Sequence, residues 1–131
     1  MSEKFHTELN RLKQDTTEMV QFARDMLCES VNALNGQDTA KALQVVSKKK
    51  QIRDVTITLE ERTYQLIALY QPMAKDMRVI ACTLKMITAS ERIGRYGKDI
   101  AKYGQAPPGP ARFYPTTSYT AHGRKGTGND R

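Results

Sequence analysis

The chain has 131 residues, 27% of them charged, and its mean hydropathy is −0.61. It is long enough for one domain with a modest core, and no apolar run approaches the roughly 18 residues of a membrane span. The net charge of +7 favours an anionic partner, but residues 1–104 carry only 17 basic against 13 acidic side chains, which is weak evidence for nucleic-acid binding. We expect a cytoplasmic protein without membrane insertion, because MSEKFHTELN lacks the apolar region of a signal peptide.

The first predicted helix covers about residues 5–34. Its apolar side has the 4-3-4-3 spacing of a heptad seam, which predicts one long face buried against other helices. The seam consists of Phe5, Leu9, Leu12, Thr16, Met19, Ala23, Met26, Ser30 and Ala33, and it is widened by Val20, Leu27, Val31 and Leu34.

The second predicted helix covers about residues 39–70. Before it, Asn35-Gly36 predicts a left-handed stop of the first helix, and Asp38 is the natural N-cap of the second. The apolar side of the second helix carries Ala42, Val45, Val46, Ile52, Leu59, Leu66 and Ile67.

The third predicted helix begins at Gln71-Pro72, because proline disfavours a helical residue before it and suits the first position of a new helix. Its expected seam, again at 3-4 spacing, is Met77, Ile80, Leu84, Ile87, Glu91, Gly94, Lys98 and Ala101. Three helices of roughly 30 residues with very short turns must pack as antiparallel neighbours. We therefore predict an all-α fold, an elongated antiparallel three-helix bundle formed by residues 1–104, with helices about 45 Å long.

Residues 105–131 differ in composition from the bundle. The segment from Gly104 onward holds four of the five prolines and five of the eight glycines and has no helical period, which predicts a flexible, disordered C-terminal tail. The alternative is a tail that docks onto the bundle through its aromatic residues Phe113, Tyr114 and Tyr119.

The sulfur-containing residues are expected to serve the core. Cys28 and Cys82 lie far apart beside apolar helical positions, which predicts buried free thiols. A row of methionines at helical spacing is typical of core filling rather than of a cofactor site, and we assign Met19, Met26 and Met77 to it.

Glu91 is the charged residue that most needs an explanation, because it follows apolar residues on the seam of the third helix. It lies 20 residues after Gln71, about 30 Å along that helix, so the facing level of the second helix is near residue 51. A carboxylate on an apolar face needs a partner, and Lys49, Arg53 and Arg95 are the candidates. Gly94 costs about 1 kcal/mol of helix propensity, which predicts a close helix approach there.

The stretch LYQPMAKDMRVIACTLKMITASERIGRYGKDIA resembles the signature of the PhoU phosphate-uptake regulators, in particular their archaeal branch. The resemblance covers roughly residues 5–103 and implies a PhoU-like (spectrin-like) three-helix bundle without catalysis. It also implies contact with the phosphate ABC transporter, through its ATPase subunit, and with a sensor kinase. The residues that carry the motifs, and that are candidates for interaction, are Gln71, Pro72, Asp76, Arg78, Glu91, Arg92, Gly94 and Asp99.

The chain departs from the family pattern in two ways. Family members generally hold two such bundles, whereas this chain has one, which predicts a homodimer that rebuilds the pair or else a truncated copy. Members also bind multinuclear metal through E/D-x-x-x-D motifs, which fall here at Lys49 and Arg53 and at Glu91 and Arg95. Three of the four ligand positions are cations, which repel hard metals, so we predict no metal and no other cofactor.

We therefore predict a non-enzymatic regulator of phosphate uptake that acts by protein contact; the sequence contains no nucleophile elbow, P-loop or dinucleotide fingerprint. One alternative is a basic helical nucleic-acid-binding protein that uses Lys48, Lys49, Lys50 and Arg53 with the GRKG of the tail. Another is a degenerate copy of the family without a surviving partner.

Overall fold

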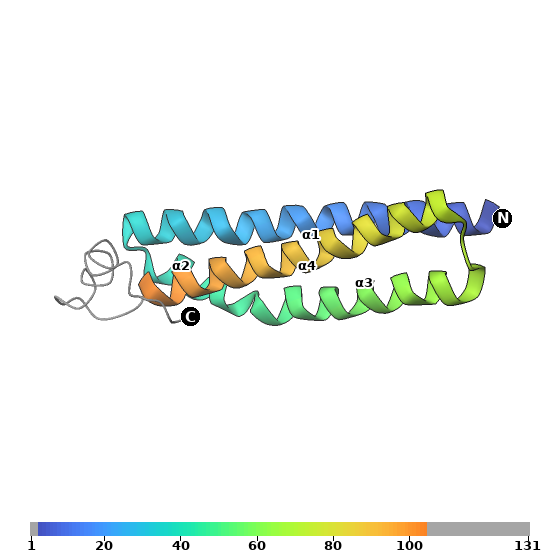
Figure 1. Cartoon of the computed structure of the whole chain (residues 1–131). Coiled ribbons are helices and arrows are strands. Elements are labelled where there is room, and N and C mark those ends of the chain that lie inside the picture. The colour runs from blue at the N-terminus through green and yellow to red at the C-terminus, as the bar shows by residue number, and fades with distance from the viewer. Residues whose placement is uncertain (1–2, 105–131) are drawn as a thin grey trace, which may run out of the picture.

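The computed structural model describes residues 3–104, which form four α-helices and no strand. They are α1 (Glu3–Gly36), α2 (Thr39–Ser47), α3 (Lys49–Tyr70) and α4 (Ala74–Gly104). In Figure 1, α1 and α4 run in one direction and α2 and α3 together return in the other, so the molecule is a long up-down-up bundle. This confirms the predicted all-α, three-helix architecture. The predicted tail, residues 105–131, lies outside the described residues.

The heptad seam of the first helix is confirmed, because α1 buries all nine of its residues. The polar members of the seam satisfy their hydroxyl groups within the helix. Thr16 donates to the Leu12 carbonyl at 2.8 Å, and Ser30 donates to the Leu27 carbonyl at 2.6 Å. The expected widening of the seam is correct for three residues only, since Val20, Leu27 and Leu34 are half-buried but Val31 is exposed.

The left-handed turn after α1 is shifted by one residue from the predicted Asn35-Gly36. α1 continues through Gly36, and the left-handed residue is Gln37, with φ of 52°. The Asp38 N–H donates to the Ala33 carbonyl at 2.9 Å. This bond, which closes many helix C-termini, requires a left-handed backbone conformation at the preceding residue, Gln37. Asp38 then caps α2, as predicted, by accepting a hydrogen bond from the Lys41 N–H at 3.0 Å.

The second predicted helix is broken at Lys48, so the expectation of one continuous helix was wrong. Directly before the break, the Ser47 hydroxyl donates to the Gln44 carbonyl at 2.6 Å. Such a bond competes with the helical backbone pattern and is a known cause of bends. The Lys48 ammonium crosses to α1, where it lies 3.0 Å from Glu29 and 5.8 Å from the centre of the Phe22 ring.

The break between the second and third predicted helices lies where the sequence placed it. Gln71 ends α3 in a left-handed conformation, with φ of 46°, and its N–H bonds the Ile67 carbonyl at 3.0 Å. Pro72 belongs to the connection rather than to the first turn of α4, which begins at Ala74.

The seam of α4 is rotated from the predicted one. Its buried residues are Ile80, Thr83, Ile87, Ser90, Gly94, Gly97 and Ala101, while Leu84, Glu91 and Lys98 lie half-buried on one flank. The cause is close packing against α1. A Cβ atom on Gly97 would lie 2.9 Å from the Met26 carbonyl carbon and 3.0 Å from the Leu27 nitrogen. At Gly94, where the sequence placed the close helix approach, a Cβ atom would meet the end of the Ile52 side chain, at 2.6 Å from Cδ1, so the backbone contact lies one turn further on, at Gly97.

The prediction that both cysteines are buried was wrong. Both Cys28 and Cys82 are free thiols on the surface, because each lies on the side of its helix that faces away from the buried seam. The methionine prediction is confirmed: Met19 and Met26 are buried, and Met77 packs against the core. Within residues 3–104, no helix combines the length and apolar character that crossing a bilayer requires.

Candidate functional site

A pocket of about 350 Å³ lies between α3 and α4 and is lined mainly by cations. α3 contributes Lys49, Ile52 and Arg53, and α4 contributes Glu91, Gly94, Arg95 and Lys98. The four positions that the family motif places at one level of two facing helices therefore do meet in space. Lys98 completes the set, although its 3-4 spacing from the apolar residues of α4 predicted a place on the buried seam.

Glu91 is half of an ion pair within α4. Its Oε1 lies 2.5 Å from Arg95 Nη2, one turn further along the same helix. The Glu91 side chain is 26% exposed and that of Arg95 is 54% exposed, so water screens the pair. Of the three candidate partners, Arg95 therefore pairs with Glu91, and the pair lies half-buried at the edge of the core.

The pocket as a whole has an excess of positive charge. Lys49, Arg53, Arg95 and Lys98 stand against the single carboxylate of Glu91, a formal charge of +3. Among the side chains of the pocket that form ion pairs, that of Lys98 is the least exposed. Its ammonium group lies 3.1 Å from Asp99. Such a pocket attracts anionic groups and repels cations.

This donor set does not fit a hard divalent cation or a multinuclear metal centre. Such metals take several oxygen ligands, whereas the pocket offers one carboxylate, and that carboxylate is held by Arg95. In residues 3–104, no three His, Cys, Asp or Glu side chains are grouped as metal ligands would be. Two further acidic residues have partners elsewhere: Asp54 pairs with Lys50 at 2.8 Å, and Asp76 lies 3.5 Å from His6.

The remaining motif residues do not converge on this pocket. Gln71, Pro72 and Asp76 lie at the end of the bundle where α3 turns into α4, and Arg78 is exposed in the next turn. Asp76 and Glu91 are 15 residues apart, about 22 Å along the helix. The side chains of Arg92 and Asp99 face solvent further along α4. The motifs thus mark the turn and the length of α4 rather than one site.

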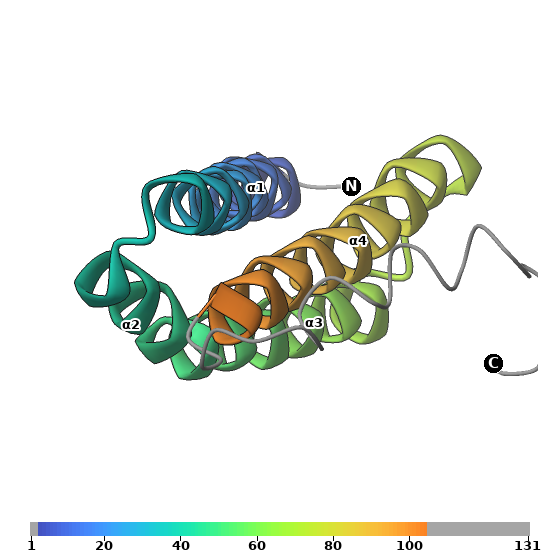
Figure 2. The same cartoon turned by 90° about the vertical axis from the view of Figure 1, so that its left-hand side faces the viewer.

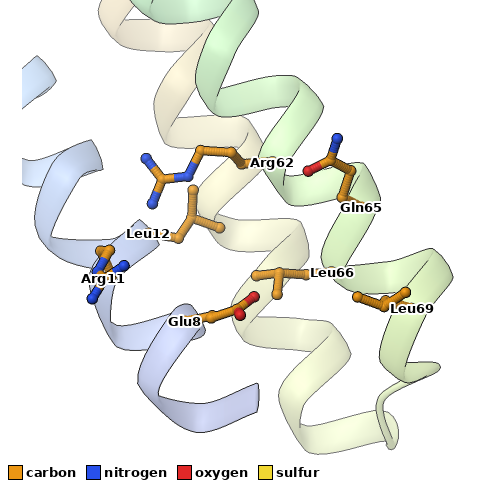
Figure 3. A pocket seen from close by; sticks show the side chains of 7 residues that line it. All are labelled: Glu8, Arg11, Leu12, Arg62, Gln65, Leu66 and Leu69. Carbon is orange, nitrogen blue, oxygen red and sulfur yellow. The ribbon is translucent and has the colours of Figure 1, made fainter. Parts of the chain in front are cut away.

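A second hollow lies between α1 and α3 and was not predicted. Figure 3 shows the side chains that line its pocket of about 440 Å³, which come from both helices: Glu8, Arg11, Leu12, Arg62, Gln65, Leu66 and Leu69. Arg62 also lines a neighbouring pocket of about 460 Å³ and pairs with Asp15 across the groove at 2.6 Å. In the sequence, Asp15 and Arg62 each lie next to the apolar seam of their helix. Spacing along one helix does not show that these two charges face each other across the groove.

Comparison with known proteins identifies a family. The model of the PhoU domain matches residues 16–104. The chain is 33% identical over 99 residues to a protein of Clostridium acetobutylicum named phosphate-specific transport system accessory protein PhoU homolog, covering 75% of this chain and 45% of that protein. It is 36% identical over 98 residues to the protein of that name from Rhizobium meliloti, covering 75% and 41%.

The similarity to Escherichia coli phosphate-specific transport system accessory protein PhoU is 26% identity over 102 residues, which covers 78% of this chain and 42% of that protein. The chain therefore spans less than half the length of these curated relatives.

Proposed function

Because the chain belongs to the PhoU family, we propose that it is a non-enzymatic regulator of phosphate uptake and phosphate homeostasis that acts by contact with the phosphate ABC transport system. One observation carries the proposal. The family model covers α2, α3, α4 and most of α1, so the match extends over the folded bundle rather than over a local motif. Relatives that cover this same bundle are named accessories of phosphate-specific transport.

The chemistry of the described residues supports contact rather than catalysis. The pocket between α3 and α4 presents ammonium and guanidinium groups, which attract anions and donate hydrogen bonds. Its carboxylate is occupied by Arg95, one turn away on the same helix. A general base must instead lie within hydrogen-bonding reach of a substrate proton. Cationic side chains of this kind are suited to an acidic surface on another protein.

The proposed partner is the ATPase subunit of the phosphate transporter, with a sensor kinase as a second partner, both on the ground of family resemblance. The test is to copurify the chain from membranes at its native level, in cells with and without the phosphate transporter. We expect the chain in the membrane fraction only when the transporter is present. Equal recovery from both strains would refute contact with the transporter, and no recovery from either would favour a degenerate copy without a partner.

The nucleic-acid alternative has less support from the structure. Two of the four cations in its basic stretch are paired, because Lys48 lies 3.0 Å from Glu29 and Lys50 lies 2.8 Å from Asp54. The other two, Lys49 and Arg53, line the cationic pocket between α3 and α4. The GRKG segment of the tail lies outside the described residues. Titration with nonspecific duplex DNA at low and physiological salt separates the two functions, since strong binding with a steep salt dependence would favour nucleic acid.

A further inference from the structure

α4 carries a second apolar row beside its buried seam. The row has the same 3-4 spacing, and each member directly precedes a residue of the seam or its continuation: Val79, Cys82, Met86, Ala89, Ile93, Tyr96, Ile100 and Tyr103. Its exposed large side chains, Met86, Ile93, Tyr96 and Tyr103, are between 36% and 52% exposed. Large apolar side chains that gather in one row at the surface mark an interaction site more often than scattered ones do.

This row faces away from α3. The flank of α4 that faces α3 holds Glu91, Arg95 and Lys98, which line the cationic pocket, and the apolar row lies on the opposite flank. In the end-on view of Figure 2, α1 and α3 lie on different sides of α4. No described helix covers the surface that α1 and α4 share on the side remote from α3.

α1 extends the apolar surface. Its flank toward α3 holds Glu8, Asp15 and Glu18, and its other flank holds Val20, Leu27, Val31 and Leu34. The two helices are in close contact here, since a Cβ atom on Gly97 would lie 2.9 Å from Met26 and one on Gly104 would lie 3.5 Å from Leu34 Cδ1. We call this combined surface, the α4 row with Val20, Leu27, Val31 and Leu34, the α1–α4 face.

The border of the α1–α4 face is basic. Exposed cations flank it on both helices: Lys13 and Arg24 on α1, and Arg78, Lys85 and Arg92 on α4. Acidic side chains occur on these bordering rows toward the two ends of the bundle, as Glu3 and as Asp99, which is paired with Lys98. Beside the border, Asp25 lies 3.8 Å from Arg24 and offsets part of its charge, so the border rests mainly on the other four cations. The described acidic residues of α1 lie mostly on its α3 side, where Glu8, Asp15 and Glu18 line the groove.

We propose that the α1–α4 face docks an amphipathic helix of another protein, with acidic residues along its edges. The 3-4 spacing of the row matches the spacing at which one helix inserts side chains between those of another. The basic border complements acidic edges and steers their approach. The inference rests on the proposed function only in that the chain acts through protein contact, and it names the chemistry of the partner rather than its identity.

Charge and shape argue against two other occupants. A second copy of the chain would bring its own basic border against this one, and like charges that face each other across an interface oppose association. An anionic membrane would meet large apolar side chains of α4 that are only 36% to 52% exposed. Helices that bind membrane surfaces instead bury a protruding apolar face in the lipid.

The probe is a synthetic helix of three heptads with leucine at the seam positions and glutamate at the flanking positions, and the control peptide has lysine in place of glutamate. The full chain supplies its own reporter, because Cys82 lies within the α1–α4 face and Cys28 lies on the outward side of α1. Alkylation of each thiol is followed by mass spectrometry. We expect the acidic peptide to slow alkylation of Cys82 several-fold more than that of Cys28, and the basic peptide to leave both rates unchanged.

Two variants test the apolar row and its border separately. Ile93→Asp should weaken binding of the acidic peptide by about tenfold or more, as loss of a central apolar contact does. Lys85→Glu with Arg92→Glu should abolish binding of the acidic peptide and create binding of the basic one. This reversal remains informative if Ile93→Asp unfolds. Lys50→Glu on α3, a charge reversal away from the α1–α4 face, is the control that should change nothing.

Four results would overturn the proposal. The first is that the acidic peptide leaves Cys82 unprotected, and the second is that the border reversal leaves its binding unchanged. The third is self-association that Ile93→Asp abolishes, which would assign the α1–α4 face to a second copy. The fourth is protection of Cys82 by vesicles of anionic lipid but not by the peptide, which would assign it to a membrane. Failure of the proposed role in phosphate uptake would appear in cells and would leave these results intact.

Discussion

At the scale of single residues, Glu91 shows how exposure decides the strength of an ion pair. The pair with Arg95 is short, but more than half of the Arg95 side chain is in water. Water lowers the Coulomb attraction and reduces the cost of losing a partner. The sequence places Glu91 on the seam and calls for a cationic partner, and a buried partner would make removal of the carboxylate cost about 1–3 kcal/mol. The observed exposure predicts a smaller loss.

We expect Glu91→Ala to lower the free energy of unfolding by less than about 1 kcal/mol, measured by urea denaturation. Asp54→Ala is the matched control, because it removes a carboxylate from the exposed i,i+4 pair with Lys50 on α3. The two variants should behave alike. A loss above about 2 kcal/mol for Glu91→Ala alone would mean that its cationic neighbours depend on it as buried groups do.

Gly97 is the glycine of α4 at which an added methyl group would meet the backbone of α1 rather than the end of a side chain. Gly97→Ala should lower the free energy of unfolding by about 1–3 kcal/mol in spite of alanine's better helix propensity. Gly36→Ala is the control with open space around it, and it should be neutral or stabilising. Equal effects of the two substitutions, measured by thermal unfolding, would contradict the close approach.

At the scale of elements, periodicity predicted the helices whose core positions are large and apolar. All nine buried residues of α1 follow from their spacing. The spacing in α4 was misread because Thr83, Ser90 and Gly97 are small or polar, and nothing in one sequence shows that a neighbouring helix requires small residues there. The sequence around the break at Lys48 contains no proline or glycine that would predict it. The break is accompanied by the hydrogen bond from the Ser47 hydroxyl to the Gln44 carbonyl and by the contact of Lys48 with Glu29 on α1.

The candidate site was predictable in part for a similar reason. Antiparallel helices of known rise place Lys49, Arg53, Glu91 and Arg95 at one level, and this counting does not require the core to be right. The exposure of these side chains and the ion pairs that they form depend on how each helix is rotated about its axis. The predicted seam of α4 gave the wrong rotation for that helix. Lys98 was therefore given to the core, and the groove between α1 and α3 was missed.

The loss of carboxylates between α3 and α4 leads to a prediction about metal. Lys49→Asp, Arg53→Asp and Arg95→Asp together with Glu91 would place four carboxylates around one pocket. This variant should retain transition metal after gel filtration, measured by elemental analysis, while the parent retains none, because oxygen ligands replace repelling cations. Lys13→Asp with Lys75→Asp and Lys85→Asp changes the charge equally away from the pocket and should bind none. Stoichiometric metal in the purified parent would contradict this account.

At the scale of the whole molecule, the chain spans less than half the length of the relatives that it matches, and we predict that two copies associate in a two-fold dimer. The α1–α4 face is excluded by its basic border, so we place self-association on the outer side of α3. There Ile57 and Tyr64 are exposed, and neighbouring charges have both signs, with Lys50 and Glu60 among them.

Sedimentation equilibrium at tens of micromolar should therefore show a dimer of the parent chain. Ile57→Asp should shift the mass toward the monomer, because it places a charge in the proposed contact, whereas Ile93→Asp should leave the mass unchanged. A strictly monomeric parent would refute self-association. A dimer that Ile93→Asp dissociates and Ile57→Asp does not would place the contact on the wrong face.

The central claim is that this single PhoU bundle restrains phosphate uptake by protein contact, and the rate of labelled phosphate uptake in the source organism tests it most directly. In phosphate-rich medium, cells that lack the chain should take up phosphate faster than the parent strain. A plasmid copy of the chain should restore the lower rate. Cells whose uptake is the same with and without the chain, at both high and low phosphate, would contradict the account.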